Sequence, residues 1–313
     1  MDLLRDFPQL HVHQKEFEFL LIRATDGLLD LRTAFIDNYS EIRIDMAIRR
    51  FLVLIHNLSS EPTSFTSPSS LISPPGQSYS KFFPNFENYS EIFLKNISFS
   101  SEEYWPFPSL YKSSLGSFFE KIKNLLHTPN IKFKFNSYVT PKAFDIYMNE
   151  FLQNVLFSKI PNDKQIVVTS NMLEVYNPKN FFDAIQPCKL VIVDRDPRGI
   201  FCSLPFKDKE MALNDKQVAN EFIEKFKFQR SNRFAKNLNH ENILNLKFED
   251  LFIDFDDSLE KLGLFLKTTL PEKFSNFSKD RSLKNFQPWQ TNENAVAIKM
   301  IEHELKEFLL PRS

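Results

Sequence analysis

The second half of the chain alternates short, mainly apolar runs with longer stretches in which apolar residues recur at helical spacing. The short runs occupy 165–168, 190–193 and 243–246. Runs of this length without polar alternation are typical of strands that a parallel sheet buries on both faces. We therefore predict an α/β fold, in which helices cover both faces of a parallel sheet.

The first half of the chain is mainly helical. A run at 10–13 is short enough for a buried strand, and Phe7-Pro8 ends the helical pattern of the first residues. Amphipathic spacing predicts two helices within 28–57. Further helices are predicted over 110–127, 141–157, 178–184, 197–204, 215–238 and 256–266.

One stretch, at about 59–80, has a different composition, dominated by Ser, Thr and Pro. This composition is typical of a loop, and long loops inside compact domains tend to be lids, binding loops or disordered segments. The chain has no internal repeat. We therefore predict a single domain over 1–313 with a loop excursion at about 59–80.

Charge and composition argue against several classes of protein. The 39 basic and 40 acidic residues cancel, so no overall field favours nucleic acid or an anionic membrane. No apolar run approaches the roughly 20 residues that span a bilayer, and acidic residues interrupt the N-terminus where a signal peptide would be apolar. The two cysteines are too few for a disulfide framework. We expect a cytoplasmic protein without a transmembrane segment or a nucleic-acid partner.

The residues with the clearest chemistry follow the predicted strand at 190–193. That strand ends at Asp194, and Pro197 begins the next helix, so Arg195 is expected at the carboxyl edge of the sheet, where α/β proteins bind ligands. Ser203 lies about two helical turns further on. A guanidinium and a hydroxyl that converge there suit a phosphate group. The alternative is a surface ion pair between Arg195 and Asp196, with Ser203 merely helical; this stretch alone supports both equally.

This stretch resembles the 3′-phosphate-binding motif of the sulfotransferase superfamily, in which an Arg follows a strand and a Ser lies eight residues beyond it. The resemblance implies that Arg195 and Ser203 hold the 3′-phosphate of the sulfate donor 3′-phosphoadenosine 5′-phosphosulfate (PAPS). It also implies a P-loop-like fold. A later basic segment, containing Arg281 and Lys284, is similar to the family segment that closes over the donor phosphates.

A second match covers 242–251 and 258–266, which resemble the family's strand, its YEDL turn and the helix after the turn. Phe248 stands where Tyr is usual. Because carboxylates are favoured at helix N-termini, Glu249 and Asp250 are expected to cap a helix there. We assign them a structural and not a catalytic role.

The N-terminal residues 3–16 resemble the segment that follows the phosphate loop in carbohydrate sulfotransferases. The resemblance implies that Glu16 is the general base for an acceptor hydroxyl and that Lys15 helps to neutralise the transferred group. The alternative is that both are ordinary surface charges. His13 is a reserve candidate for the base, although a packed histidine is favoured. Residues 169–171 are expected at the end of a strand, facing the crevice in which the donor and the acceptor would bind.

Family members begin with a strand and a loop resembling GxPRSGTT, and no such segment occurs here; the 5 glycines do not cluster. We therefore expect the first strand and the phosphate loop to be missing. Either Met1 is an internal methionine taken for the start, or the loop has been lost. The first explanation is favoured, because a parallel sheet without its first strand would expose unpaired edges.

Together these matches indicate a PAPS-dependent sulfotransferase that modifies a hydroxyl, and the Lys15-Glu16 pair favours a carbohydrate acceptor. No metal is implied. The alternative is a truncated or degenerate sulfotransferase-like domain without catalysis, which binds a nucleotide, a glycan or a protein partner. Another P-loop enzyme, such as a kinase, is disfavoured because the chain has no G-x-x-x-x-G-K-[ST] motif.

Overall fold

The structure is a computed structural model, and it describes residues 1–13, 18–61, 77–103, 105, 107, 132–173, 178–204, 215–233, 240–283, 286–290 and 295–309. The strands are β1 (Leu10–Val12), β2 (Phe99–Glu103), β3 (Lys132–Asn136), β4 (Ile166–Val168), β5 (Leu190–Asp194) and β6 (Ile243–Lys247). The helices are α1 (Asp2–Arg5), α2 (Leu28–Phe35), α3 (Glu41–Ser59), α4 (Tyr79–Phe82), α5 (Phe86–Ile97), α7 (Pro141–Leu156), α8 (Lys179–Ala184), α9 (Pro197–Ser203), α10 (Asp215–Phe228), α11 (Asp250–Ile253), α12 (Phe255–Leu266), α13 (Lys279–Leu283) and α14 (Ala295–Glu304).

The four predicted strands are present and their pairing is parallel. β1 pairs with β4, and β5 pairs with β6 from Leu190 opposite Ile243 to Asp194 opposite Lys247. Helices combined with short parallel sheets confirm the α/β class in this coarse form.

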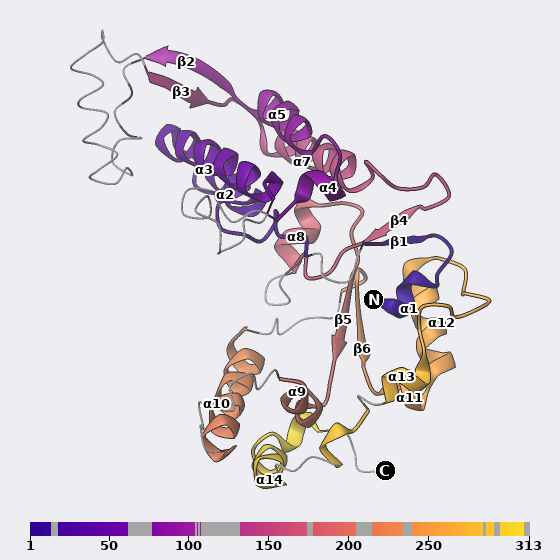
Figure 1. The fold of residues 1–313 in the computed structure, drawn as a ribbon. Coiled ribbons are helices and arrows are strands. Elements are labelled where there is room, and N and C mark those ends of the chain that lie inside the picture. Colours follow the sequence, from indigo (N-terminus) through magenta and orange to yellow (C-terminus); the bar gives the residue numbers. More distant parts are fainter. Residues whose placement is uncertain are drawn as a thin grey trace.

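The expected single sheet is not what the described strands form. β1–β4 and β5–β6 are separate pairs, and β2–β3 is an antiparallel hairpin. Figure 1 shows β5 and β6 side by side, running toward α9 and away from β1 and β4. A sheet of two strands buries little side-chain surface. The side chains of β4 are therefore only half-buried, and Val193 of β5 is 54% exposed. Both pairs nevertheless contribute to one apolar cluster with α12, which contains Leu10, Leu246 and Leu262.

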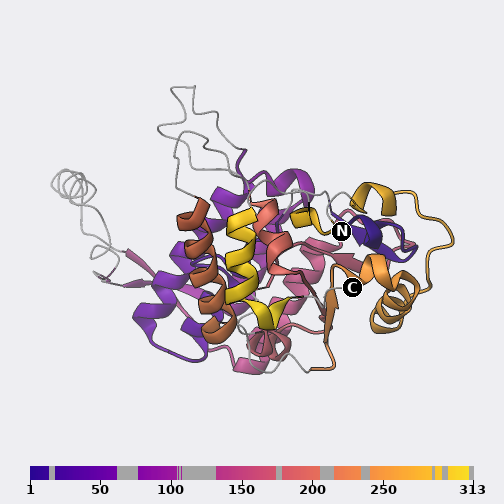
Figure 2. The ribbon, with the colours of Figure 1, turned by 90° about the horizontal axis from the view of Figure 1, so that it is seen from below.

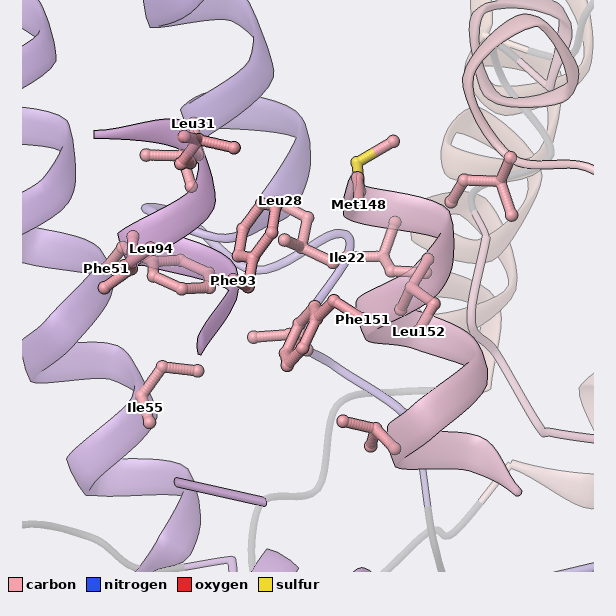
Figure 3. Close-up of a cluster of buried hydrophobic side chains, with 14 of the residues drawn as sticks. Ile22, Leu28, Leu31, Phe51, Ile55, Phe93, Leu94, Met148, Phe151 and Leu152 are labelled. Carbon is pink, nitrogen blue, oxygen red and sulfur yellow. The ribbon is translucent and has the colours of Figure 1, made fainter. Parts of the chain in front are cut away.

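The largest core lies among α2, α3, α5 and α7. Figure 3 shows apolar side chains of these helices pointing toward one another, with the rings of Phe93 and Phe151 stacked at 5.0 Å between centroids. Ser40 caps α3 by accepting a hydrogen bond from the Arg43 N–H (3.2 Å), and Thr140 precedes Pro141 at the start of α7. The helices predicted within 28–57 and over 141–157 are therefore confirmed.

The hairpin β2–β3, which the sequence analysis did not predict, is fastened to α3 through Asp45. The Asp45 carboxylate is fully buried and accepts hydrogen bonds from the Arg49 guanidinium, the Trp105 indole N–H (3.0 Å) and the Phe135 N–H (3.0 Å). Three donors satisfy this buried charge, which removes the penalty of an unpaired one.

Helices α9, α10 and α14 form a smaller apolar cluster, and Figures 1 and 2 show α10 and α14 side by side. Phe201 of α9 packs there with Ile223 and Ile301, so this cluster holds α9 at the end of β5. α10 is α-helical only to Phe228, after which a π-helical turn covers Gln229–Arg233.

Some predictions fall partly or wholly outside the described residues. They are the helix over 110–127, the end of the helix over 215–238, and residues 62–76 of the Ser/Pro-rich stretch. At the flanks of that stretch, α3 continues to Ser59 and α4 begins at Tyr79, so those residues are helical and not loop. The single domain over 1–313 stays a prediction.

Candidate functional site

The connection between β5 and α9 is the sharp turn that the sequence predicts. β5 ends at Asp194, and α9 begins at Pro197, where a missing N–H costs no helical hydrogen bond. Asp196 caps α9 by accepting a hydrogen bond from the Arg198 N–H at 2.9 Å. Arg195 therefore lies at the carboxyl end of β5, as expected.

Arg195 and Ser203 come together although α9 lies between them. The Arg195 Nη1 atom lies 3.3 Å from Ser203 Oγ, on the exposed side of the turn, and the Ser203 hydroxyl donates to the Ile200 carbonyl at 2.8 Å. Burial lowers the pKa of the Arg195 guanidinium. Because the hydroxyl can rotate away from the Ile200 carbonyl, the guanidinium and the hydroxyl can both donate to one phosphate or sulfate group.

Asp196 does not lie at the surface, so the interpretation of this turn as a surface ion pair is wrong. Asp196 is 2% exposed, and its carboxylate accepts from the Arg198 guanidinium at 2.7 and 2.9 Å. Arg198 also donates to Glu302 of α14 (2.9 Å) and lies over the Trp289 ring at 4.4 Å. Burial alone would lower the pKa of Arg198, but the hydrogen bonds to both carboxylates raise it.

The Arg195 guanidinium lies between an aromatic ring and a glycine. Its carbon lies 4.8 Å from the centroid of Phe248, a cation–π distance. On α9, a β-carbon added to Gly199 would lie 2.8 Å from Arg195 Nε and 3.2 Å from the ring of Trp289. Gly199 is therefore needed for the close approach of Arg195, a role that the sequence analysis did not assign.

Glu249 does not act as the predicted helix cap. It lies at the start of α11, but its side chain makes no capping hydrogen bond. Instead, Glu249 Oε1 accepts from the Asp196 N–H at 2.9 Å, across the pairing of β5 with β6. Burial and the neighbouring Asp196 carboxylate raise the pKa of Glu249, while hydrogen bonds and Arg195 oppose the rise. The prediction of a structural role is compatible with this contact, but its reason was wrong.

A second guanidinium reaches the end of β5. Arg230, in the π-helical turn after α10, contacts the Asp194 carboxylate and stacks over Phe226 at 5.0 Å. π-helical turns occur frequently at functional sites. The sequence contains no signal that could have placed Arg230 there.

The remaining predicted site residues are not tested by this geometry. Lys15, Glu16 and Lys284 lie outside the described residues. Arg281 belongs to α13, and its side chain is not among those described. The structure thus brings Arg195 and Ser203 together, and the roles of the other four residues stay predictions.

The carboxyl ends of β1 and β4 carry a separate polar group. Glu18 forms a parallel bridge with Ser170, and its carboxylate accepts from Asn171 Nδ2 and from the Arg23 guanidinium, both at 2.6 Å. Residues 169–171 therefore lie at the end of β4, as predicted. Glu18 was not singled out from the sequence, because a lone carboxylate carries no spacing signal.

His13 is packed and not presented to solvent. It is 9% exposed, and its ring makes edge contacts with His11 (4.9 Å) and Phe83 (5.2 Å). Burial, assisted by the nearby His11, lowers the pKa of His13 to about 4. The structure therefore favours the packed histidine over the reserve base.

The depressed pKa of His13 predicts a loss of stability on acidification. Between about pH 4 and pH 6.5 the unfolded state binds more protons than the folded state, so the free energy of unfolding falls as the pH falls through this window. At about 1.4 kcal/mol per pKa unit, the loss approaches about 3 kcal/mol. Urea denaturation at a series of pH values should show that His13→Leu flattens this dependence. The exposed His303 of α14 provides the control: His303→Leu should keep the wild-type slope, and the same slope in His13→Leu would refute the assignment.

Two further findings concern the described residues only. They contain no group of three or more His, Cys, Asp or Glu side chains that could hold a metal ion. None of the helices in this part of the chain has the length and apolar character needed to cross a membrane.

A family model described as a sulfotransferase domain matches residues 145–310. No curated protein and no solved structure matches the chain significantly. The matched residues include β5, α9, β6 and the turn after β6, which together form the surroundings of Arg195. Because the match spans more than half of the chain, the chain belongs to the sulfotransferase superfamily.

Proposed function

We propose that the chain transfers the sulfuryl group of PAPS to a hydroxyl of a carbohydrate. The observation that carries the proposal is the convergence of Arg195 and Ser203 at the carboxyl end of β5, at 3.3 Å. Membership of the superfamily supports sulfuryl transfer in general, and these two donors support a phosphate-bearing donor molecule.

The described residues fit the 3′-phosphate of PAPS. The Arg195 guanidinium is oriented by Phe248 and Gly199, and Ser203 Oγ lies on the same exposed side of the turn. When bound, PAPS supplies the sulfuryl group. Arg195 and Ser203 would hold its 3′-phosphate, and Arg281 and Lys284 would contact its phosphates from the later basic segment.

The acceptor half of the proposal rests on the N-terminal resemblance. Glu16 would accept the proton of the acceptor hydroxyl, and Lys15 would offset negative charge on the transferred group. A carbohydrate is proposed because this pair resembles that of carbohydrate sulfotransferases.

We assign no metal to the reaction. A cytoplasmic location is proposed from cysteine usage, and neither Cys188 nor Cys202 forms a disulfide.

The test is a calorimetric titration with adenosine 3′,5′-bisphosphate (PAP), the donor without its sulfuryl group. Arg195→Ala is expected to weaken PAP binding by about 10–150-fold, equivalent to about 1.5–3 kcal/mol for hydrogen bonds to a charged group. The control is Arg50→Ala, which removes a half-exposed arginine near Asp26 on the helical part of the fold.

The control should bind PAP like the wild type. A change below about twofold in Arg195→Ala, or no binding of PAP to the folded wild-type protein, would contradict the proposal.

A further inference from the structure

The turn that follows β6 reaches across to the turn that carries Arg195. The Phe248 N–H donates to the Asp194 carbonyl at 2.7 Å, which extends the pairing of β5 with β6 by one hydrogen bond. The Phe248 ring then lies against the Arg195 guanidinium, and Glu249 accepts from the Asp196 N–H. Phe248 and Glu249 thus hold the backbone on both sides of Arg195, and Phe248 also contacts the guanidinium itself.

The Glu249 carboxylate is buried, but within the described part of the chain only its Oε1 atom accepts a hydrogen bond. Glu249 is 1% exposed, and its Oε2 atom is buried with no hydrogen-bond partner among the described residues. A buried carboxylate oxygen without a donor is costly in its charged form and can hold a proton instead.

The charges that face Glu249 come from the β5–α9 connection. The Asp196 carboxylate disfavours a second negative charge, and the Arg195 guanidinium favours it. Arg198 pairs with the Asp196 carboxylate and also with Glu302 of α14. The positive charge of Arg195 therefore supports an ionised Glu249, and Arg195 is also the cation that a bound anion would engage.

We propose that Glu249 is a positioning residue for Arg195, and that it takes up a proton when an anion binds to Arg195. The inference rests on the proposed donor site. An anion at Arg195 adds negative charge near Glu249 and offsets the positive charge of the guanidinium, so the ionised carboxylate loses its electrostatic support. The proton comes from the solvent and binds to Oε2, while Oε1 continues to accept from the Asp196 N–H.

The experiment is a calorimetric titration with PAP in buffers of equal pH but different ionisation enthalpy, which counts the protons exchanged on binding. PAP has its own titrating phosphate, so the wild type is compared with Glu249→Gln, in which that contribution is the same. Over about pH 5–8, we expect the wild type to take up more protons per PAP than Glu249→Gln, with a difference that shrinks toward high pH. The exposed Glu260 of α12 provides the control: Glu260→Gln should match the wild type.

The positioning role is tested by a pair of variants. Glu249→Ala leaves the Asp196 N–H without its acceptor and should weaken PAP binding by about tenfold or more. Glu249→Gln keeps an acceptor oxygen and should restore the affinity to within about threefold. A residue that only stabilises the fold would change the midpoint of unfolding in Glu249→Ala without changing the PAP affinity of the folded protein.

Each outcome decides the inference. Equal proton counts in the wild type and Glu249→Gln would overturn the proton uptake, and unchanged PAP affinity in folded Glu249→Ala would overturn the positioning role. If Glu249→Ala does not fold, the proton counts of the wild type and Glu249→Gln still decide whether Glu249 takes up the proton. No PAP binding by the folded wild type would overturn the donor site and the inference together, whereas PAP binding with equal proton counts leaves the proposed function standing.

Discussion

Asp196→Ala is expected to lower the free energy of unfolding by about 3–5 kcal/mol, the range for breaking a buried ion pair from one side. Asp196 and Arg198 are 2% and 4% exposed, and the carboxylate holds the guanidinium through two hydrogen bonds. The substitution removes both the partner of the Arg198 guanidinium and the cap of α9, in which the carboxylate accepts from the Arg198 N–H. Urea denaturation followed by circular dichroism measures the loss.

The control for this substitution is Asp257→Ala on α12. Asp257 also pairs with a cation, Lys261 at 2.5 Å, but both side chains are mostly exposed. Exposed pairs contribute little, so this variant should lose no more than about 1 kcal/mol. Equal losses in the two variants would show that burial of the Asp196 pair does not determine its contribution to stability.

Glu16→Gln is expected to lower the turnover number by about 10²–10⁴-fold, the usual contribution of a general base. A glutamine of the same size can accept a hydrogen bond from an acceptor hydroxyl but cannot take its proton. PAP affinity should stay within about twofold, because the proposed contacts to the 3′-phosphate lie on β5 and α9, far from Glu16 in the sequence. The measurement is PAP release from PAPS with a carbohydrate that the wild type sulfates, made on protein that includes the phosphate loop.

Glu18→Gln is the matched control for this prediction, since Glu18 lies two residues further along the chain. Its carboxylate is already engaged by Asn171 and Arg23, so it is not available to an acceptor hydroxyl. Turnover should fall much less than in Glu16→Gln. Full turnover in Glu16→Gln, with a large loss in Glu18→Gln, would transfer the role of base to Glu18.

The parallel strands could be predicted because each is a short, mainly apolar run. The observed β4, β5 and β6 lie within about one residue of the predicted ranges. The grouping of these strands could not be predicted. Apolar strands of similar composition are interchangeable as partners, and the pattern of a single strand contains no register.

The hairpin β2–β3 shows where the hydrophobic pattern is misleading. Residues 132–135 alternate Lys and Phe, a signal for a strand whose Phe side faces the core. The structure does the opposite at the centre: Lys134 is 5% exposed and Phe133 is 55% exposed. Lys134 is tolerated inside because it pairs with Glu41 at 2.7 Å and lies over the Trp105 ring at 4.2 Å. Such partners come from distant parts of the sequence.

At the candidate site, the spacing from Arg195 to Ser203 together with the family resemblance was enough to predict their convergence. The roles of Gly199, Phe248 and Glu249 could not be predicted, because they depend on the pairing of β5 with β6. The roles of Lys15 and Glu16 toward the acceptor, and the missing first strand and loop, stay predictions.

The pairing of β5 with β6 also has a consequence for how the protein folds. Asp194 and Lys247 are neighbours in space but far apart in the chain, so their pairing requires the closure of a long loop. Contacts of this kind form slowly, because their entropic cost is met before any of them stabilises the chain. Arg195 meets Phe248 and Glu249 only once that loop has closed. Neither strand's segment contains the complete set on its own, so the proposed anion site at this turn forms during folding together with the long-range topology.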